Sequence, residues 1–249
     1  MGQDWLGSDG KVVHPNAPRG GGGAGSFQSP KHFGGEVEAF CIPHPNSPAG
    51  RNAFLTAAQV QCLQENKLKF NKLNAQAAVD YVQDRMTLGA GNKPKDVVVS
   101  LGDSATCVVN ERRDEEPDPN DVVPPVGNGT MPIEEYLREV ARIAEKNGCG
   151  NCGEQSAMAF VYLLNGNTRP IDWMCLEKEG VDWWQFREGD HAFVIVGRSP
   201  FSNDDEPDTW GPEAIVCDPW NGDVYPPHQL IPKWGHRPRL LYRVEGQTK

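Results

Sequence analysis

The segment of residues 152–164 places the strongest constraint on how this chain folds. At helical spacing its side chains are apolar nearly all the way round, because Ala, Phe, Val and Leu dominate it. A helix without a polar face has to be buried, so we expect it at the centre of a domain. Four runs with the composition of strands follow it, at 171–176, 191–196, 214–218 and 240–244. Helices followed by strands predict an α+β domain over residues 128–249.

A second helix is predicted before the buried one. Apolar residues recur at helical spacing from Ile133 to Ala144. The preceding segment Thr130-Met-Pro132 is typical of a helix N-terminus, and Gly148 is a suitable end. These two helices would form the helical part of the domain.

The first half of the chain has a different character. Residues 1–50 are rich in Gly and Pro and show neither helical nor strand periodicity, which is typical of a flexible leader. The patterns of residues 51–127 predict a helical hairpin whose second helix is capped by Asn74, short strands at 96–101 and 106–109, and an acidic linker at 112–127.

Charge and composition exclude several classes of function. The formal net charge is −10 and no basic tract is present, whereas binding to phosphate backbones needs clustered Lys and Arg. We therefore expect no nucleic-acid partner. No run approaches the roughly 18–20 apolar residues that span a bilayer, so we expect no membrane span. The N-terminal sequence lacks the apolar stretch of a conventional signal peptide, which favours a cytoplasmic location in the producing cell.

The segment most informative about chemistry lies at the start of the buried helix. Asn151 and Glu154 have the spacing of a capping box, which would make Cys152 the first residue of the helix. The unpaired amides and the positive dipole end at that position favour a thiolate, and a thiolate is a nucleophile. Cys152 is therefore a candidate catalytic nucleophile. The alternative is a small buried residue without a chemical role.

Two further residues complete a candidate catalytic triad. His191 begins a strongly apolar run, where an imidazole has no packing reason to be, and Asp218 ends the next such run. His191 would take the proton of the Cys152 thiol, and Asp218 would orient and stabilise the imidazolium. The alternatives are a hydrogen-bonded core histidine and an Asp that starts a turn. Reserve candidates are His228 and His236 for the base, and Asp190 and Asp223 for the carboxylate.

The seven cysteines leave other chemistries open. Their odd number and their scatter favour free thiols in a reducing compartment. Cys149 and Cys152 form a C-x-x-C pair, which also suits a redox motif, a zinc site or a protective disulfide. A redox motif should follow a strand, however, and this pair follows a helix. The remaining zinc candidates, Cys175, His191 and Cys217, are single residues, so we expect no bound metal and no cofactor.

The same residues carry a family resemblance. The segments 150–166, 190–197 and 216–222 resemble the core of transglutaminase-like and papain-like Cys-His-Asp proteins, and also the cysteine proteases and glutamine deamidases among bacterial effector toxins. The resemblance covers about residues 130–249. It implies an α+β papain-like core, in which a central helix that carries the Cys packs on an antiparallel sheet that carries the His and the Asp, preceded by a helical N-terminal region.

The resemblance also implies roles for single residues. Cys152 takes the position of the nucleophile, His191 that of the base and Asp218 that of the orienting acid. Such families stabilise the oxyanion with the amide of the nucleophile and a further side chain, for which Asn151 is the candidate. A toxin of this kind would be exported into a target cell by a dedicated secretion system. Its partners would be a protein substrate and an inhibitor, immunity protein or chaperone.

A Cys-His-Asp site performs acyl transfer through a thioester, here on Cys152. We expect hydrolysis of an amide in a protein substrate by a glutamine deamidase or a cysteine protease. A transglutaminase and a peptidoglycan amidase are alternatives, because they share the nucleophilic machinery. Outside enzymes, the alternatives are a binding module with an inert thiol and a C-x-x-C redox or zinc protein.

Overall fold

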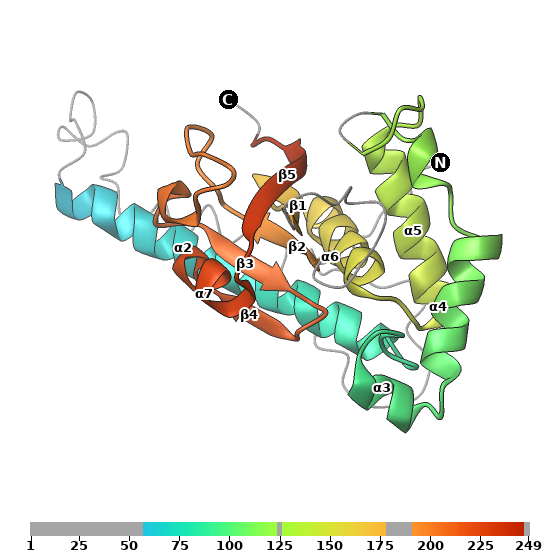
Figure 1. Cartoon of the computed structure of the whole chain (residues 1–249). Coiled ribbons are helices and arrows are strands. Elements are labelled where there is room, and N and C mark those ends of the chain that lie inside the picture. The colour runs from blue at the N-terminus through green and yellow to red at the C-terminus, as the bar shows by residue number, and fades with distance from the viewer. Residues whose placement is uncertain (1–56, 124–125, 178–190, 247–249) are drawn as a thin grey trace, which may run out of the picture.

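Helices make up the first part of the described chain, and strands make up most of the second (Figure 1). The computed structural model describes residues 57–123, 126–177 and 191–246, so the predicted leader at 1–50 lies outside the described residues. The α-helices are α2 (Ala57–Arg85), α3 (Pro94–Val99), α4 (Asp103–Asp114), α5 (Ile133–Asn147), α6 (Cys152–Asn165) and α7 (Leu230–Trp234). The strands are β1 (Ile171–Glu177), β2 (His191–Val196), β3 (Ile215–Asp218), β4 (Asp223–Tyr225) and β5 (Arg237–Val244). The described part is therefore an α+β fold, as the sequence predicts.

Within the described residues the strands form one antiparallel sheet in the order β4-β3-β2-β1-β5. Successive side chains of a strand point to opposite faces. Val194 and Val196 of β2 belong to the hydrophobic cluster that includes α6, whereas Phe193 and Ile195 belong to a second cluster with Trp210. Both faces of the sheet are thus covered. This explains why the central strands are apolar without interruption.

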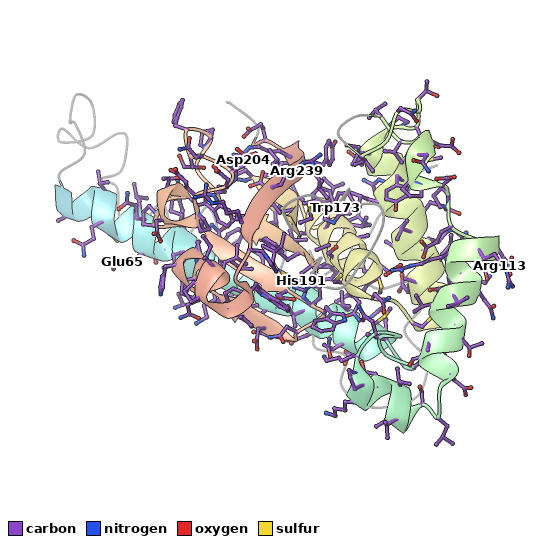
Figure 2. The ribbon with its side chains drawn as sticks, viewed as in Figure 1. Glu65, Arg113, Trp173, His191, Asp204 and Arg239 are labelled. Carbon is purple, nitrogen blue, oxygen red and sulfur yellow. A yellow bond between two sulfur atoms is a disulfide. The ribbon has the colours of Figure 1, made fainter. Side chains whose placement is uncertain are left out.

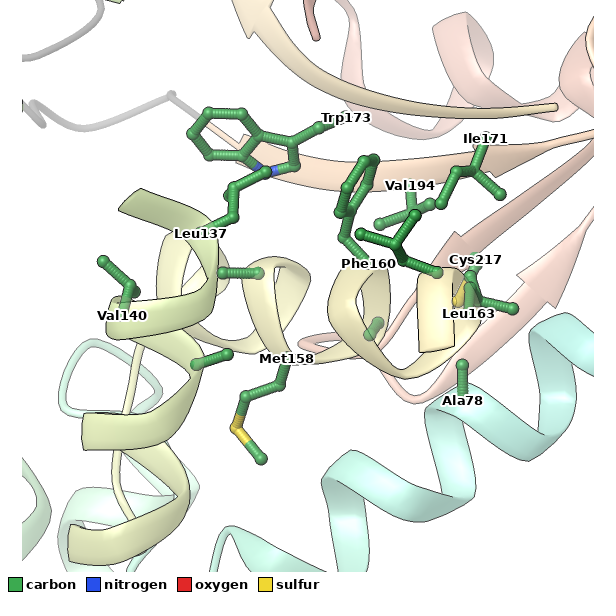
Figure 3. Close-up of a cluster of buried hydrophobic side chains, with 14 of the residues drawn as sticks. Ala78, Leu137, Val140, Met158, Phe160, Leu163, Ile171, Trp173, Val194 and Cys217 are labelled. Carbon is green, nitrogen blue, oxygen red and sulfur yellow. The ribbon is translucent and has the colours of Figure 1, made fainter. Parts of the chain in front are cut away.

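Helix α6 packs on one face of this sheet. Phe160 of α6 and Val194 of β2 lie in one hydrophobic cluster (Figure 3). Leu137 of α5 and Ala78 of α2 belong to the same cluster, so two further helices cover α6. Burying a large apolar side chain contributes about 1.5–3 kcal/mol. These contacts hold α6 firmly and so define the position of its first residue, Cys152.

The structure confirms the helices and strands predicted for the second half of the chain. Helix α5 runs from Ile133 to Asn147, and the C-cap Gly148 has a φ of 73°, a left-handed conformation that glycine adopts without strain. Helix α6 begins at Cys152, and strands lie at each of the runs expected to form them. The sequence pattern did not predict β4 and α7, because such short elements show no clear periodicity.

The predicted helical hairpin is wrong, because α2 is a single helix of 29 residues. Asn74 was expected to cap a second helix, but its Nδ2 donates to the Phe70 carbonyl at 3.0 Å, one turn earlier in the same helix. No Gly or Pro interrupts α2, and Ala78 and Val82 pack into the main hydrophobic cluster. Although α2 is long, no helix in the described part of the chain is apolar enough along such a length to cross a membrane.

The two predicted short strands are also wrong. Residues 96–101 lie in α3 and directly after it, and residues 106–109 lie within α4. Pro94 occupies the first turn of α3, and Gly102, at φ 94°, precedes α4. Val98, one of the β-branched residues that suggested a strand, is 73% exposed. The described sheet ends at β4 and β5, so neither segment has a strand to pair with.

The described residues of the predicted acidic linker at 112–127, which are 112–123 and 126–127, pack against the rest of the protein. Helix α4 continues to Asp114, and a short 3-10 helix, η1, follows at Pro119–Asp121. Val122 and Val126 are buried in the main hydrophobic cluster. Apolar contacts therefore cross the predicted boundary between residues 127 and 128, because this segment and α2 share a core with α6.

Candidate active site

Cys152 is the first residue of α6, as the capping pattern predicts. Asn151 and Glu154 form the reciprocal capping box, in which the main-chain N–H of Asn151 donates to Glu154 Oε2 at 2.7 Å. The amides of the first helical turn and the positive end of the helix dipole lie around the buried Cys152 side chain. This environment favours negative charge on a thiol.

Arg112 of α4 holds this helix start in place. Its Nε donates to Glu154 Oε1 at 2.6 Å, while the other oxygen of the same carboxylate accepts from Asn151. Glu154 is 3% exposed, so its charge would be costly without the guanidinium. Arg112 could not be predicted from the sequence, because no sequence spacing connects it with Glu154 before α4 and α6 are packed together.

The pairing of β2 with β3 brings His191 and Asp218 together. His191, labelled in Figure 2, begins β2, and Asp218 ends the neighbouring antiparallel strand β3. Both therefore lie at the same end of the sheet. His191 Nε2 is 2.9 Å from Asp218 Oδ2, and both residues are buried, with exposures of 4% and 0%. The same imidazole also interacts with Cys152.

The charge on His191 follows from its two neighbours. Burial by itself lowers the pKa of the imidazolium, but hydrogen bonds with Asp218 and Cys152 and their negative charges outweigh it and raise the pKa to about 9. The candidate nucleophile, base and carboxylate are therefore brought together around one imidazole. An imidazolium next to a thiol favours the thiolate, which is the reactive form.

Asp218 is itself oriented by hydrogen bonds. The main-chain N–H of Asn221 donates to Oδ1 at 3.1 Å, and the Tyr225 hydroxyl donates to Oδ2 at 3.3 Å. The indole N–H of Trp234 donates to the Tyr225 oxygen at 3.1 Å. Burial raises the pKa of Tyr225, so its hydroxyl keeps the proton that it donates. These bonds fix the carboxylate oxygen that faces His191.

Aromatic rings enclose the imidazole of His191. Trp234 stacks on it with 4.0 Å between ring centroids, Trp220 approaches edge-on at 5.6 Å, and Phe193 lies at 6.0 Å. The rings exclude water and so strengthen the contact with Asp218, and a stacked indole also stabilises an imidazolium. Sequence spacing alone does not distinguish Trp220 and Trp234 from the other tryptophans in this half of the chain.

Asn151, the candidate oxyanion donor, uses its side-chain oxygen for structure. Oδ1 accepts from the main-chain N–H of Asn92 at 3.0 Å, which ties the loop after α2 to the start of α6. The indole N–H of Trp220 donates to Asn92 Oδ1 at 3.0 Å, so the same loop also contacts the aromatic group. Only Nδ2 of Asn151 is left for an oxyanion, and that role stays a prediction. Asn92 could not be predicted as part of the site, because it lies in a segment without a sequence pattern.

The three reserve candidates that the structure describes are not part of this arrangement. Asp223 pairs with Lys233, with 2.6 Å between Oδ2 and Nζ. His228 is exposed on the 3-10 helix η4 (Pro227–Gln229), and His236 lies between α7 and β5. Asp190 lies outside the described residues.

The cysteines differ from the prediction of mostly free thiols. Cys107 of α4 and Cys149 form a disulfide, so the expectation is wrong for this pair. Cys149 therefore bonds to Cys107 and not to Cys152, which excludes the predicted protective disulfide within the C-x-x-C pair in this structure. Cys107 could not be predicted as the partner of Cys149, because the sequence pattern of residues 106–109 predicts a strand. Only the tertiary packing of α4 brings Cys107 close to Cys149. Cys152, Cys175 and Cys217 are thiols.

One group of side chains in the described part of the chain has the proximity that a metal ion needs. It consists of Cys107, Glu111 and Cys149, whose potential ligand atoms all lie within 4.8 Å of one another. None of the candidate triad residues belongs to this group. The zinc ligands considered from the sequence alone, Cys175, His191 and Cys217, do not belong to it either.

No family model matches the chain, and searches of the curated proteins and of the solved structures return no match. Inference about function therefore depends on the geometry of the site. That geometry places a thiol at a helix N-terminus, an imidazole beside it and a buried carboxylate behind the imidazole. Such a group can generate a thiolate and shuttle a proton.

Proposed function

We propose that this protein is a cysteine hydrolase that cleaves an amide in a protein substrate, with a catalytic triad of Cys152, His191 and Asp218. One arrangement carries the proposal: His191 contacts Asp218 at 2.9 Å through Nε2 and also hydrogen-bonds Cys152 at the start of α6. The alternative, a core histidine that merely hydrogen-bonds a carboxylate, does not explain why a thiol at a helix N-terminus is its second partner.

The proposed reaction has two steps. The Cys152 thiolate attacks the carbonyl carbon of the amide, the C–N bond breaks, and the nitrogen leaves as ammonia or an amine after taking a proton from the His191 imidazolium. Water then attacks the thioester, gives a proton to His191, and releases the carboxylic acid and the Cys152 thiolate. Asp218 keeps the ring oriented and stabilises its charged form in both steps. The main-chain N–H of Cys152 and Nδ2 of Asn151 are the proposed oxyanion donors.

A papain-like or transglutaminase-like arrangement is part of the proposal. Its support is a Cys-bearing helix packed on an antiparallel sheet whose neighbouring strands carry the His and the Asp. Through the resemblance to effector toxins, we propose glutamine deamidation first and proteolysis second. Export into a target cell, and control by an inhibitor, immunity protein or chaperone, belong to the same proposal.

The first experiment tests for a thiolate–imidazolium pair. Iodoacetamide labelling from about pH 4 to about pH 9, followed by peptide mapping, measures the pH at which Cys152 reaches half its maximal rate. We expect that pH to lie well below that of N-acetylcysteine. The comparison concerns the shape of the pH profile, because burial slows all labelling of Cys152.

Two variants make this experiment decisive. His191→Ala should move the profile of Cys152 to that of an ordinary thiol, whereas the matched change His228→Ala, at an exposed histidine, should leave it where it was. An ordinary profile in the unmodified protein, or one that does not respond to His191→Ala, would overturn the triad and leave a binding module with an inert thiol.

The second experiment identifies the reaction. The full chain is incubated with a pool of protein-derived peptides, and mass spectrometry looks for Gln converted to Glu and for new peptide termini. Conversion of Gln supports the deamidase, and new termini support the protease. A product that also forms with Cys152→Ser does not come from the proposed site.

A further inference from the structure

Two potential metal ligands on helix α4 lie next to a third, which comes from the segment between α5 and α6. Cys107 and Glu111 are four residues apart in α4, so they lie on the same side of the helix. Cys149 follows α5 directly and is bonded to Cys107. The ligand atoms of the three residues all lie within 4.8 Å of one another. Two zinc ligands, each about 2.0–2.3 Å from the ion, lie at most about 4.6 Å apart, so small side-chain movements suffice to form a site.

Glu111 supplies a second, independent observation. Its side chain is 1% exposed, and among the described residues neither carboxylate oxygen has a partner at normal hydrogen-bond geometry, although the side chain of Asn147 lies close by. Buried polar groups in proteins are nearly always satisfied, because the loss of water costs free energy. A buried carboxylate that faces two sulfur atoms therefore needs a partner that the disulfide form does not provide.

We propose that Cys107, Glu111 and Cys149 form a zinc site when the disulfide between the two cysteines is reduced. A dithiol supplies the two electrons and two protons of the reduction and becomes a disulfide itself, which leaves Cys107 and Cys149 as thiols. Zn²⁺ then replaces the two thiol protons, which pass to solvent. The ion binds two thiolates, one Glu111 oxygen and a water molecule.

The chemistry of the ligands selects the metal. Thiolates favour zinc over magnesium and calcium, and four-coordinate zinc accepts a mixture of sulfur and carboxylate ligands. The ion would also offset the negative charges of the three ligands in a buried place. Magnesium and calcium prefer oxygen ligands alone and so do not suit this site.

The site would connect the same two parts of the fold in both redox states. The disulfide ties α4 to the residue three positions before Cys152, and the zinc ion would do the same through the same sulfur atoms. Arg112, next to Glu111 in α4, would stay beside Glu154 in both states. The inference does not rest on the proposed function, because Cys152 contributes no ligand.

The test uses the full chain with Cys152→Ser, which removes the candidate nucleophile from all measurements. The protein is reduced with dithiothreitol, freed of the reductant without oxygen, and titrated with Co²⁺ and then Zn²⁺. We expect thiolate-to-cobalt charge-transfer absorption and the strong visible bands of tetrahedral cobalt, both lost when Zn²⁺ replaces Co²⁺. The same protein kept oxidised has the same three residues without thiolates, and should show neither absorption.

Glu111→Gln tests the carboxylate ligand and keeps the disulfide, so its folding can be checked by circular dichroism before reduction. We expect its affinity for Zn²⁺ to fall by more than the roughly 10–100-fold that is typical for loss of an outer-shell partner. Glu115→Gln, four residues later at the exposed end of α4, is the matched control and should bind as before.

Two results would overturn the zinc site. One is the absence of charge-transfer absorption in the reduced protein. The other is equal Zn²⁺ affinity in Glu111→Gln and Glu115→Gln. A rise in the melting temperature of the reduced protein with Zn²⁺, absent from the oxidised protein, would show that the ion binds the folded state.

Discussion

The indole ring of Trp234 lies over the imidazole of His191, with 4.0 Å between the ring centroids and 22° between the planes. The indole N–H of the same residue donates to Tyr225, whose hydroxyl donates to Asp218. Trp234 therefore contacts the candidate base through its ring and the candidate carboxylate through one intermediate. It is a positioning residue, since it acts on Cys152 only through these neighbours.

Trp234→Leu should lower the pKa of His191 from about 9, because the imidazolium loses the stacked ring. A cation–π contact of about 1 kcal/mol corresponds to slightly less than one pH unit. NMR titration of the His191 ring measures the change. Trp234→Phe keeps a ring and removes the N–H, so it should lower the pKa less. Equal pKa values in both variants and the unmodified protein would show that the stack has no electrostatic role.

Asp218→Asn should weaken the positive charge on His191 and thereby the reactivity of Cys152. The neutral amide no longer stabilises the imidazolium, so the pKa of His191 falls from about 9. At neutral pH the alkylation rate of Cys152 should drop by about tenfold or more, because fewer thiolates are present. Asp223→Asn, at an exposed carboxylate of the neighbouring strand β4, is the control and should change the rate little. Similar rates for both variants would contradict the role of Asp218.

In the Cys152→Ser protein, which has no thiol at this position to release a proton in the same range, stability should fall as the pH rises from 6.5 towards about 9. The pKa of His191 is raised from 6.5 to about 9 in the folded state, so the folded protein holds the proton more tightly than the unfolded chain. The stabilisation that the raised pKa of His191 provides is complete below pH 6.5 and is lost as the pH rises through about 9. Its size is on the order of 3 kcal/mol.

Urea unfolding at several pH values in this window measures that loss, with Cys152→Ser serving as the unmodified reference and as the background of each variant. His191→Gln should be less stable than the unmodified protein at the low end and should show a flatter pH dependence, whereas His228→Gln should follow the unmodified protein. Parallel curves for the unmodified protein and His191→Gln would refute the raised pKa.

Arg112→Met should destabilise the fold by about 2–3 kcal/mol, less than the full cost for a buried pair because Arg112 is partly exposed. The change leaves the buried carboxylate of Glu154 with its cap but without its cation. Urea unfolding of the Cys152→Ser protein measures the free energy of unfolding. Arg113→Met breaks an exposed pair with Asp114 on the same helix and should leave the free energy of unfolding nearly unchanged. Equal losses of unfolding free energy in the two variants would show that the buried pair of Arg112 and Glu154 stabilises the fold no more than the exposed pair does.

The candidate site could be predicted in part because its signals are local. Asn151 and Glu154 have capping-box spacing, and His191 and Asp218 are polar ends of apolar runs. The residues that support them could not be predicted in the same way. Arg112, Asn92 and Trp234 reach the site from distant segments, and nothing in their own sequence neighbourhood indicates this.

By itself the sequence determined the buried helix α6, the neighbouring helix α5 and the main strands of the sheet, because periodicity and caps act within a few residues. Only the tertiary structure decided the rest. Packing on α6 and the sheet keeps α2 a single helix through Asn74. Residues 96–101 and 106–109 are helical or in turns, and no strand of the described sheet pairs with them. The bond between Cys107 and Cys149 depends on α4 meeting the end of α5, a contact between segments 42 residues apart that no local pattern encodes.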